Sequence, residues 1–122
     1  MPHVLLVEDS PAMRSLVGSM VTALSGYTVR EARSGAEAIS WLSREGFELI
    51  ITDIQMPDFS GLELIRYVRD SRDHKATPLF IISTEGGVRD RERGLALGAN
   101  EYLAKPFDPQ ELLNLVRRYV SG

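Results

Sequence analysis

The sequence predicts an α/β domain in which five parallel strands form an open, doubly wound sheet covered by five helices. Short runs of β-forming residues alternate five times with segments of helical periodicity. Three of the runs are almost continuously apolar, as in strands that are buried on both faces of a parallel sheet. Most strand-to-helix junctions also contain a helix start signal. These observations predict a (βα)5 arrangement with right-handed crossovers.

The strands expected from these runs, in chain order, are 3–8, 27–31, 48–52, 78–83 and 101–104. The helices expected between and after them are 11–24, 35–44, 61–71, 88–97 and 109–120. Leu62, Ile65 and Val68 recur at helical spacing, which predicts that the third helix packs on the sheet through one apolar face.

Four of these helices begin with recognisable capping chemistry. Two S-x-x-E patterns, Ser34 with Glu37 and Ser60 with Glu63, are typical of a capping box. Ser10 and Asp108 each stand directly before a proline, which suits the first position of a helix. The fourth helix contains Gly94 and follows Gly86 and Gly87. This pattern indicates either close packing on the sheet or a helix of marginal stability that a change at a functional site could shift.

Length and composition indicate a single domain over residues 1–122. The chain has 14 Lys plus Arg against 17 Asp plus Glu, a net charge of −3 and no cysteine. This balance argues against binding to nucleic-acid phosphates, and the lack of cysteine excludes a disulfide scaffold. Apolar runs such as Val4 to Val7 are far shorter than the ~20 residues that span a bilayer. With no export signal recognised, we expect a cytoplasmic protein with no nucleic-acid partner and no membrane insertion.

Polar side chains follow four of the expected strands: Glu8 and Asp9, Asp53, Ser83 and Thr84, and Lys105. Open α/β sheets bind ligands at the carboxyl ends of their strands. Three carboxylates at one edge repel each other unless a cation lies among them, and an oxygen-only donor set suits Mg²⁺ better than zinc. Taken singly, Asp53 as a turn residue and Lys105 as a surface lysine are more probable than a functional role, and Glu8 and Asp9 could form a solvated strand end; together the residues favour a site.

If the sheet has the flavodoxin-like order 2-1-3-4-5, Asp53 is central and its neighbouring strands lie about 4.8 Å away. Lys105 is then two strands away, roughly 9 to 10 Å between strand axes, and reaches Asp53 only through its long stem. An aspartate beside a metal ion, a hydroxyl and a lysine is arranged to attack phosphorus and form an aspartyl phosphate.

These residues resemble the receiver domains of bacterial two-component response regulators, the CheY-like family. The likeness covers the whole chain and rests on four stretches: VLLVEDS (4–10), LIITDIQMPDFSG (49–61), IIST (81–84) and GANEYLAKPF (98–107). The separations also match: 44 residues from Asp9 to Asp53, 30 from Asp53 to Ser83 and 22 from Ser83 to Lys105.

The resemblance implies that Asp53 accepts phosphate from the phosphohistidine of a sensor histidine kinase. It implies Mg²⁺ held by Glu8, Asp9, Asp53 and the backbone carbonyl of Gln55, with Asp9 the favoured direct ligand.

It further implies that Ser83 is the switch hydroxyl and Tyr102 the switch aromatic, and that the peptide bond between Lys105 and Pro106 is cis. Spacing to Lys105 favours Ser83 over the adjacent Thr84.

Other positions of the motifs have plainer interpretations. Pro57 and Gly61 are turn residues before a helix. Gln55 and Glu85 stand where receivers vary the lifetime of their phosphate.

We therefore expect a phosphoacceptor signalling protein and not a turnover enzyme. Its output surface would comprise the fourth helix, fifth strand and fifth helix. The expected output partner is a flagellar motor switch or another motility or polarity protein. One alternative is a receiver-like scaffold that is never phosphorylated. Another is an aspartate-nucleophile phosphatase, which needs a second aspartate where this chain has Gln55.

Overall fold

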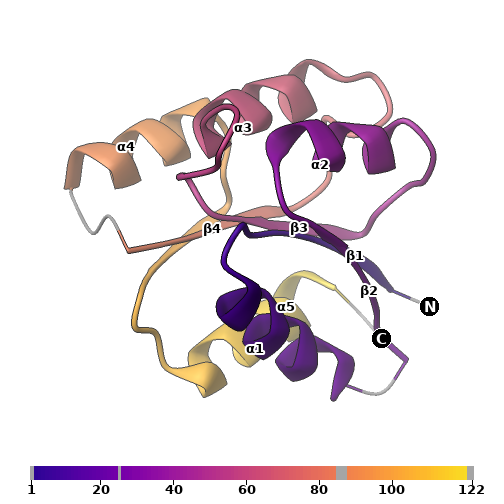
Figure 1. The fold of residues 1–122 in the computed structure, drawn as a ribbon, viewed down its shortest axis with the longest axis vertical. Coiled ribbons are helices and arrows are strands. Elements are labelled where there is room, and N and C mark those ends of the chain that lie inside the picture. The colour runs from indigo at the N-terminus through magenta and orange to yellow at the C-terminus, as the bar shows by residue number, and fades with distance from the viewer. Residues whose placement is uncertain (1, 25, 85–87, 121–122) are drawn as a thin grey trace.

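The computed structural model describes residues 2–24, 26–84 and 88–120. Within these residues, five parallel strands form one sheet in the order β2-β1-β3-β4-β5, which confirms the predicted fold class (Figure 1). The strands are β1 (His3–Val7), β2 (Thr28–Ala32), β3 (Leu49–Thr52), β4 (Leu79–Ser83) and β5 (Glu101–Ala104). The helices are α1 (Pro11–Thr22), α2 (Gly35–Leu42), α3 (Gly61–Asp70), α4 (Val88–Leu97) and α5 (Pro109–Tyr119).

Several observed elements end one or two residues away from their predicted bounds. The predicted second strand, 27–31, begins one residue before β2, whose bounds are set by its pairing with β1 from His3 opposite Thr28 to Val7 opposite Ala32. Helix α1 ends earlier than expected because its last turn becomes a 3₁₀-type turn, in which the Leu24 amide donates to the carbonyl of Val21, three residues earlier.

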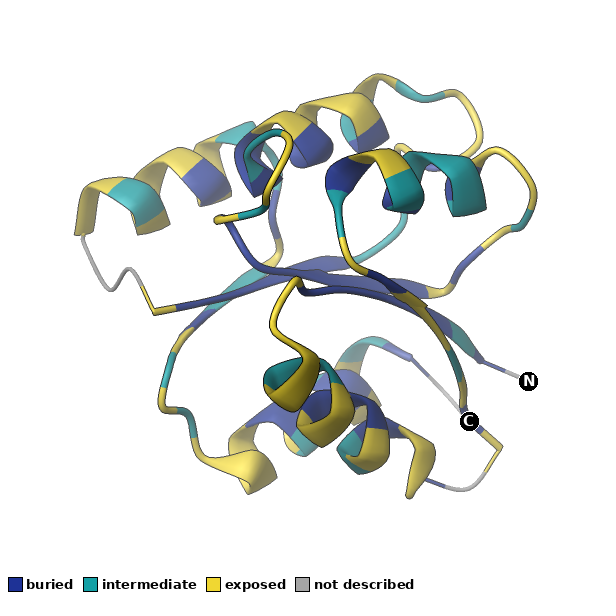
Figure 2. Ribbon diagram, in the orientation of Figure 1, coloured by how far each residue is buried: buried dark blue, intermediate teal, exposed yellow. Residues whose placement is uncertain are grey.

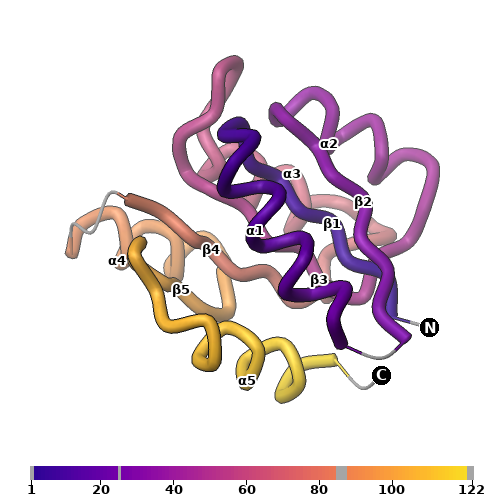
Figure 3. Tube along the Cα trace, turned by 60° about the horizontal axis from the view of Figure 1, so that its bottom comes forward, coloured from indigo at the N-terminus to yellow at the C-terminus, as the bar shows by residue number. Residues whose placement is uncertain are grey.

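The sheet separates two apolar layers, with α2, α3 and α4 on one face and α1 and α5 on the other (Figures 1 and 3). Alternate residues of each strand point into the two layers. Leu5 therefore packs in the layer under α2, α3 and α4, and Leu6 packs in the layer under α1 and α5. Figure 2 shows buried residues concentrated on the central strands and on the inner helix faces. A sheet covered on both faces leaves its strand ends as the accessible place for polar chemistry.

The side chains expected to cap helices do so, with one difference in detail. Ser34 Oγ accepts from the Glu37 amide at 3.1 Å, whereas Ser60 Oγ accepts from the Leu62 amide at 3.0 Å and not from that of Glu63. Ser10 Oγ accepts from the Met13 amide at 3.3 Å, and Asp108 Oδ1 accepts from the Gln110 amide at 2.9 Å.

Gly94 is the one buried residue among the described positions of α4. A Cβ at this position would lie 2.3 Å from Ile81 Cδ1, so close packing on β4 accounts for the glycine. Val88, at the start of α4, is 70% exposed, and the helix is otherwise poorly buried. Gly86 and Gly87, as well as Glu85, lie outside the described residues.

None of the helices in the described part of the chain combines the length and apolar character needed to cross a bilayer.

Candidate functional site

Three carboxylates meet at the carboxyl edge of the sheet. Glu8 and Asp9 follow β1, and Asp53 follows the neighbouring strand β3. One oxygen from each residue lies within 4.8 Å of the others. Glu8 and Asp53 are only 4% and 6% exposed, while Asp9 is open to solvent. The predicted cluster is therefore assembled, with two carboxylates inside the protein and one at its surface.

Lys105 enters this cluster from the end of β5. Its Nζ donates to Asp53 Oδ2 at 2.9 Å and to Glu8 Oε1 at 2.7 Å, and its side chain is buried. The contact with Asp53 matches the expectation from sequence, whereas the contact with Glu8 was not predicted. The peptide bond between Lys105 and Pro106 is cis.

Burial and the salt bridges shift the ionisation of two of these groups. Desolvation by burial raises the pKa of Glu8, and the hydrogen bonds from Lys105 and Ser10 only partly oppose it. Burial lowers the pKa of Lys105, but the hydrogen bonds to Glu8 and Asp53 outweigh it, so the net shift is upward. The ammonium group therefore stays charged between the two carboxylates.

Main-chain and arginine contacts hold the acidic residues in place. The Ser10 amide donates to Glu8 Oε2 at 3.1 Å, and the Gln55 amide donates to Asp53 Oδ1 at 3.2 Å. Arg14 Nη1 donates to the Glu8 carbonyl at 2.9 Å. Sequence reasoning missed Arg14, although its place one turn into α1, just after the acidic pair, was a usable signal.

The donor set at this edge suits a hard divalent cation. The three clustered side chains offer only oxygen ligands, and the backbone carbonyl expected to join them belongs to Gln55 in the loop after β3. The chain has no cysteine. Mg²⁺ prefers one or two carboxylates together with water and phosphate oxygens, so the residues present fit this ion.

The two hydroxyl residues after β4 differ in their surroundings. Ser83 is the last residue of β4 and is fully buried, and its carbonyl accepts from the Lys105 amide at 2.8 Å. Thr84 is exposed. The backbone pairing thus ties Ser83 to the segment that contains the lysine, which favours Ser83 over Thr84.

Tyr102 lies in β5, opposite Ile81 in the register with β4. Its half-buried side chain packs against the apolar layer formed under α2 and α3. Tyr102 therefore lies beside the strand that ends at Ser83.

Gly61 does more than mark a turn. Its amide donates to the Ile54 carbonyl at 2.7 Å, and a Cβ at this position would lie 2.1 Å from the Asp53 carbonyl oxygen. Only glycine allows α3 to begin this close to the backbone of Asp53. Pro57 lies exposed in the intervening loop.

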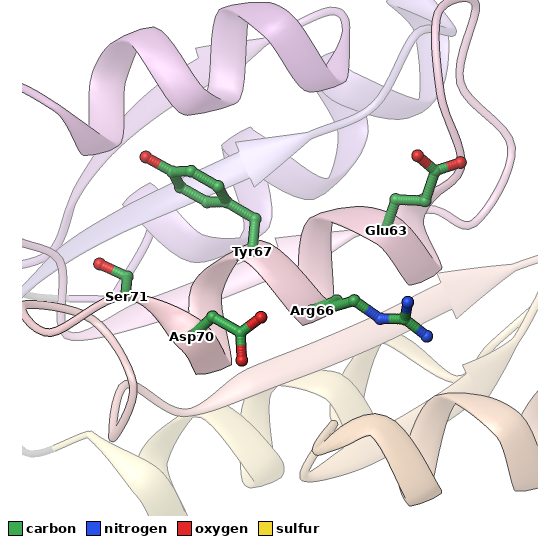
Figure 4. Close-up of a pocket in the computed structure, with 5 residues that line it drawn as sticks. All are labelled: Glu63, Arg66, Tyr67, Asp70 and Ser71. Carbon is green, nitrogen blue, oxygen red and sulfur yellow. The ribbon is translucent and has the colours of Figure 1, made fainter.

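A separate hollow lies on the outer surface of α3. Figure 4 shows its lining side chains along this helix and at the residue that ends it: Glu63, Arg66, Tyr67, Asp70 and Ser71. No residue of the acidic cluster lines it. The acidic edge, and not this hollow, therefore contains the candidate chemistry.

Open, doubly wound α/β sheets bind their ligands at the carboxyl ends of the strands, and this chain has buried carboxylates and a lysine at that edge. The family model of the response regulator receiver domain matches residues 4–117. The chain belongs to this family of two-component signalling domains, as the sequence resemblance predicted.

Relatives with different roles support this membership. The transcriptional regulatory protein TrcR of Mycobacterium tuberculosis is 40% identical over 94% of this chain and 44% of its own length. A chemotaxis protein CheY homologue of Campylobacter jejuni is 38% identical over 88% of this chain and 84% of its own. This chain therefore spans under half of TrcR and most of the CheY homologue.

A solved structure agrees closely with the fold. The chemotaxis response regulator CheY4 of Vibrio cholerae superimposes with a TM-score of 0.89 at 35% identity, covering 98% of this chain and 99% of that one. Receiver domains take phosphate from histidine kinases, bind Mg²⁺ at an acidic pocket and act on output partners. They are signalling domains and not turnover enzymes in the usual sense.

Proposed function

We propose that this chain is a phosphoacceptor that takes a phosphoryl group from a histidine kinase onto Asp53 and thereby changes a surface recognised by another protein. The observation that carries the proposal is the position of Lys105 Nζ, 2.9 Å from Asp53 Oδ2, beside two further carboxylates. If Asp53 were only a turn residue at the surface, its contact with both a buried ammonium group and an acidic cluster would have no explanation.

In the proposed reaction, a carboxylate oxygen of Asp53 attacks the phosphorus of a phosphohistidine. An O–P bond forms, the N–P bond breaks, and the imidazole nitrogen keeps the bonding electron pair and takes a proton from water. Lys105 offers a fixed positive charge to the transferred phosphoryl group. Because this ammonium already lies against Asp53, little reorganisation is needed when charge develops.

The residues that would hold Mg²⁺ are Glu8, Asp9, Asp53 and the backbone carbonyl of Gln55. When bound, the ion would reduce repulsion between the carboxylates and neutralise charge on the phosphoryl oxygens. Asp9 is the exposed member of the cluster and suits direct ligation. Glu8 already accepts hydrogen bonds from Lys105 and Ser10 on its two oxygens, which suits contact through water.

The proposed output follows from the new charge. Phosphorylation adds acceptor oxygens beside Lys105, and these would draw the Ser83 hydroxyl toward Asp53. Tyr102 would follow inward, and the exposed surface of α4, β5 and α5 would change. Helix α4 suits this role because Gly94 is its one buried residue among those described.

We propose that the output partner is a flagellar motor switch or another motility or polarity protein. The likeness to two chemotaxis response regulators, each covered over most of its own length, supports this choice.

Intact mass after incubation with a small acyl phosphate, with and without Mg²⁺, tests the proposal on the wild type and on Asp53→Asn. We expect a labile, Mg²⁺-dependent phosphoryl adduct on the wild type alone. An equal adduct on Asp53→Asn would remove Asp53 as the acceptor. If folded wild type takes phosphate from neither the small donor nor cognate kinases, a phosphate-independent scaffold becomes the better description.

A further inference from the structure

Asp58 links the loop after β3 to the start of α2. Its Oδ1 accepts from the Gly35 amide at 3.0 Å, and its Oδ2 accepts from the Ala36 amide at 2.8 Å. Both amides belong to the first turn of α2, where a helix has no internal partners for its N–H groups. Oδ1 also accepts from the Phe59 amide at 2.8 Å. One side chain therefore bridges two segments that are 22 and 23 residues apart in sequence.

Apolar packing reinforces the same junction. The ring of Phe59 covers Gly35 so closely that a Cβ on Gly35 would lie 2.2 Å from Phe59 Cζ. Gly35 is buried and Phe59 packs against the apolar layer of this face. Asp58 and Phe59 thus hold the tip of the loop against α2 by a polar and an apolar contact together.

The other end of this loop lies in the acidic site. The loop begins at Asp53 and includes Gln55, and its base is closed by the hydrogen bond from the Gly61 amide to the Ile54 carbonyl at 2.7 Å. Thr52 Oγ1 donates to the Asp53 carbonyl at 2.9 Å. The base is therefore restrained from both sides, and Asp58 supplies a polar restraint at the tip.

We propose that Asp58 is a positioning residue for the acidic site, which acts by clamping the loop of Gln55 onto the amino terminus of α2. The inference rests on the proposed function, because Gln55 matters through the metal ligand that its carbonyl supplies. Without the clamp, the loop tip loses these hydrogen bonds to α2, and the orientation of the Gln55 carbonyl is held less firmly even though the Gln55 amide still donates to Asp53 Oδ1. Asp58 is not one of the clustered carboxylates, so its proposed role is indirect.

Electrostatics favours this arrangement. The first turn of α2 presents the positive end of the helix dipole, and a carboxylate there is stabilised. Burial alone would raise the pKa of Asp58, but the hydrogen bonds from Ala36, Phe59 and Gly35 outweigh it and the net shift is downward. Asp58 therefore remains an anion and an acceptor for all three amides at neutral pH.

Two substitutions at this position and one matched control test the inference. Asp58→Ala removes all three accepted hydrogen bonds, whereas Asp58→Asn keeps an oxygen for Gly35 and Phe59 but loses the acceptor for Ala36. Ser34→Ala is the control, because it removes a cap from the same helix turn, the bond to the Glu37 amide, without touching the loop. All three variants are checked for folding by circular dichroism.

Mg²⁺ binding is measured by calorimetry, and the rate of acyl phosphate uptake is measured over a range of Mg²⁺ concentrations. Asp58→Ala is expected to weaken Mg²⁺ binding about tenfold, in the range seen when supports of metal ligands are removed. The half-saturating Mg²⁺ concentration should rise by a similar factor, with a smaller change in the maximal rate. Asp58→Asn should fall between Asp58→Ala and the wild type, and Ser34→Ala should match the wild type.

The inference is overturned if Asp58→Ala binds Mg²⁺ like the wild type. It is also overturned if Ser34→Ala weakens binding as much, since the effect would then come from the stability of α2. If Asp58→Ala does not fold, Mg²⁺ binding by Asp58→Asn is compared with that by Ser34→Ala. Weaker binding by Asp58→Asn alone supports the inference, and equal binding by the two variants overturns it. A wild type that neither binds Mg²⁺ nor takes up phosphate would instead refute the proposed function, and the inference with it.

Discussion

Replacing Gly61 with alanine should both destabilise the domain and displace the backbone of the proposed phosphoacceptor, Asp53. Gly61 begins α3, and an added Cβ would lie 2.1 Å from the Asp53 carbonyl oxygen and 2.9 Å from Ile54 Cα. Both are main-chain atoms, so no side-chain rotation relieves the overlap. Either the loop or the first turn of α3 must move by about 1 Å.

The expected cost follows from three terms. Overpacking of this kind costs about 1–3 kcal/mol. The movement also weakens the hydrogen bond from the Gly61 amide to the Ile54 carbonyl, worth about 0.5–1.5 kcal/mol. Alanine regains at most about 1 kcal/mol over glycine in a helix. The net loss in the free energy of unfolding is therefore about 2 kcal/mol.

Urea unfolding measures this loss, which should lower the midpoint by about 1 M at an unchanged slope. Gly94→Ala is the matched control, because its Cβ would lie 2.3 Å from Ile81 Cδ1, the movable end of a side chain. Its change in stability should stay within about 1 kcal/mol. Phosphoryl uptake by folded Gly61→Ala should also be slower. The reasoning fails if Gly61→Ala proves as stable as Gly94→Ala.

Three further predictions address the switch and the output face. Lys105→Ala should keep part of its phosphorylation by a small donor but lose the donor-induced change in amide hydrogen exchange of β5; a change like that of the wild type would refute the coupling. Ser83→Ala should reduce this exchange change more than Thr84→Ala does, and the reverse ranking would reassign the hydroxyl. The hydrogen bond to Glu101 raises the pKa of Tyr119 above its ordinary value of about 10. The stability that this hydrogen bond contributes is therefore complete below that ordinary value and is lost as the pH rises through the higher pKa of the folded state. The stability gap between wild type and Tyr119→Phe should therefore shrink in strong alkali, and a constant gap in urea unfolding at each pH would contradict this.

Much of the fold was predictable because its signals are local. The apolar run from Leu79 to Ile82 and the capping serine Ser34 each act within one element, so reading along the chain detects them. Strand ends were less predictable, because Ala32 belongs to β2 only through its pairing with Val7. Tertiary pairing, and not local propensity, set that boundary.

Some features of the candidate site were likewise predictable from the sequence, and others were not. Glu8, Asp9 and Asp53 stand at strand ends that any parallel sheet brings to one edge, so their proximity was foreseeable. The second contact of Lys105, with Glu8 as well as Asp53, depends on the path of a long side chain. Asp58 gave no signal of its own, because an aspartate after a proline reads as an ordinary turn residue.

The sequence by itself determined the fold class, the family and the set of residues at the carboxyl edge, because periodicity, caps and motif spacing are properties of the chain. Only the tertiary structure decided which groups touch. It buried Glu8 and Asp53 around one ammonium group, placed Ser83 inside and Thr84 outside, and attached the acceptor loop to α2 through Asp58. Such contacts join residues far apart in sequence, and their geometry is set only when the helices and the sheet pack together.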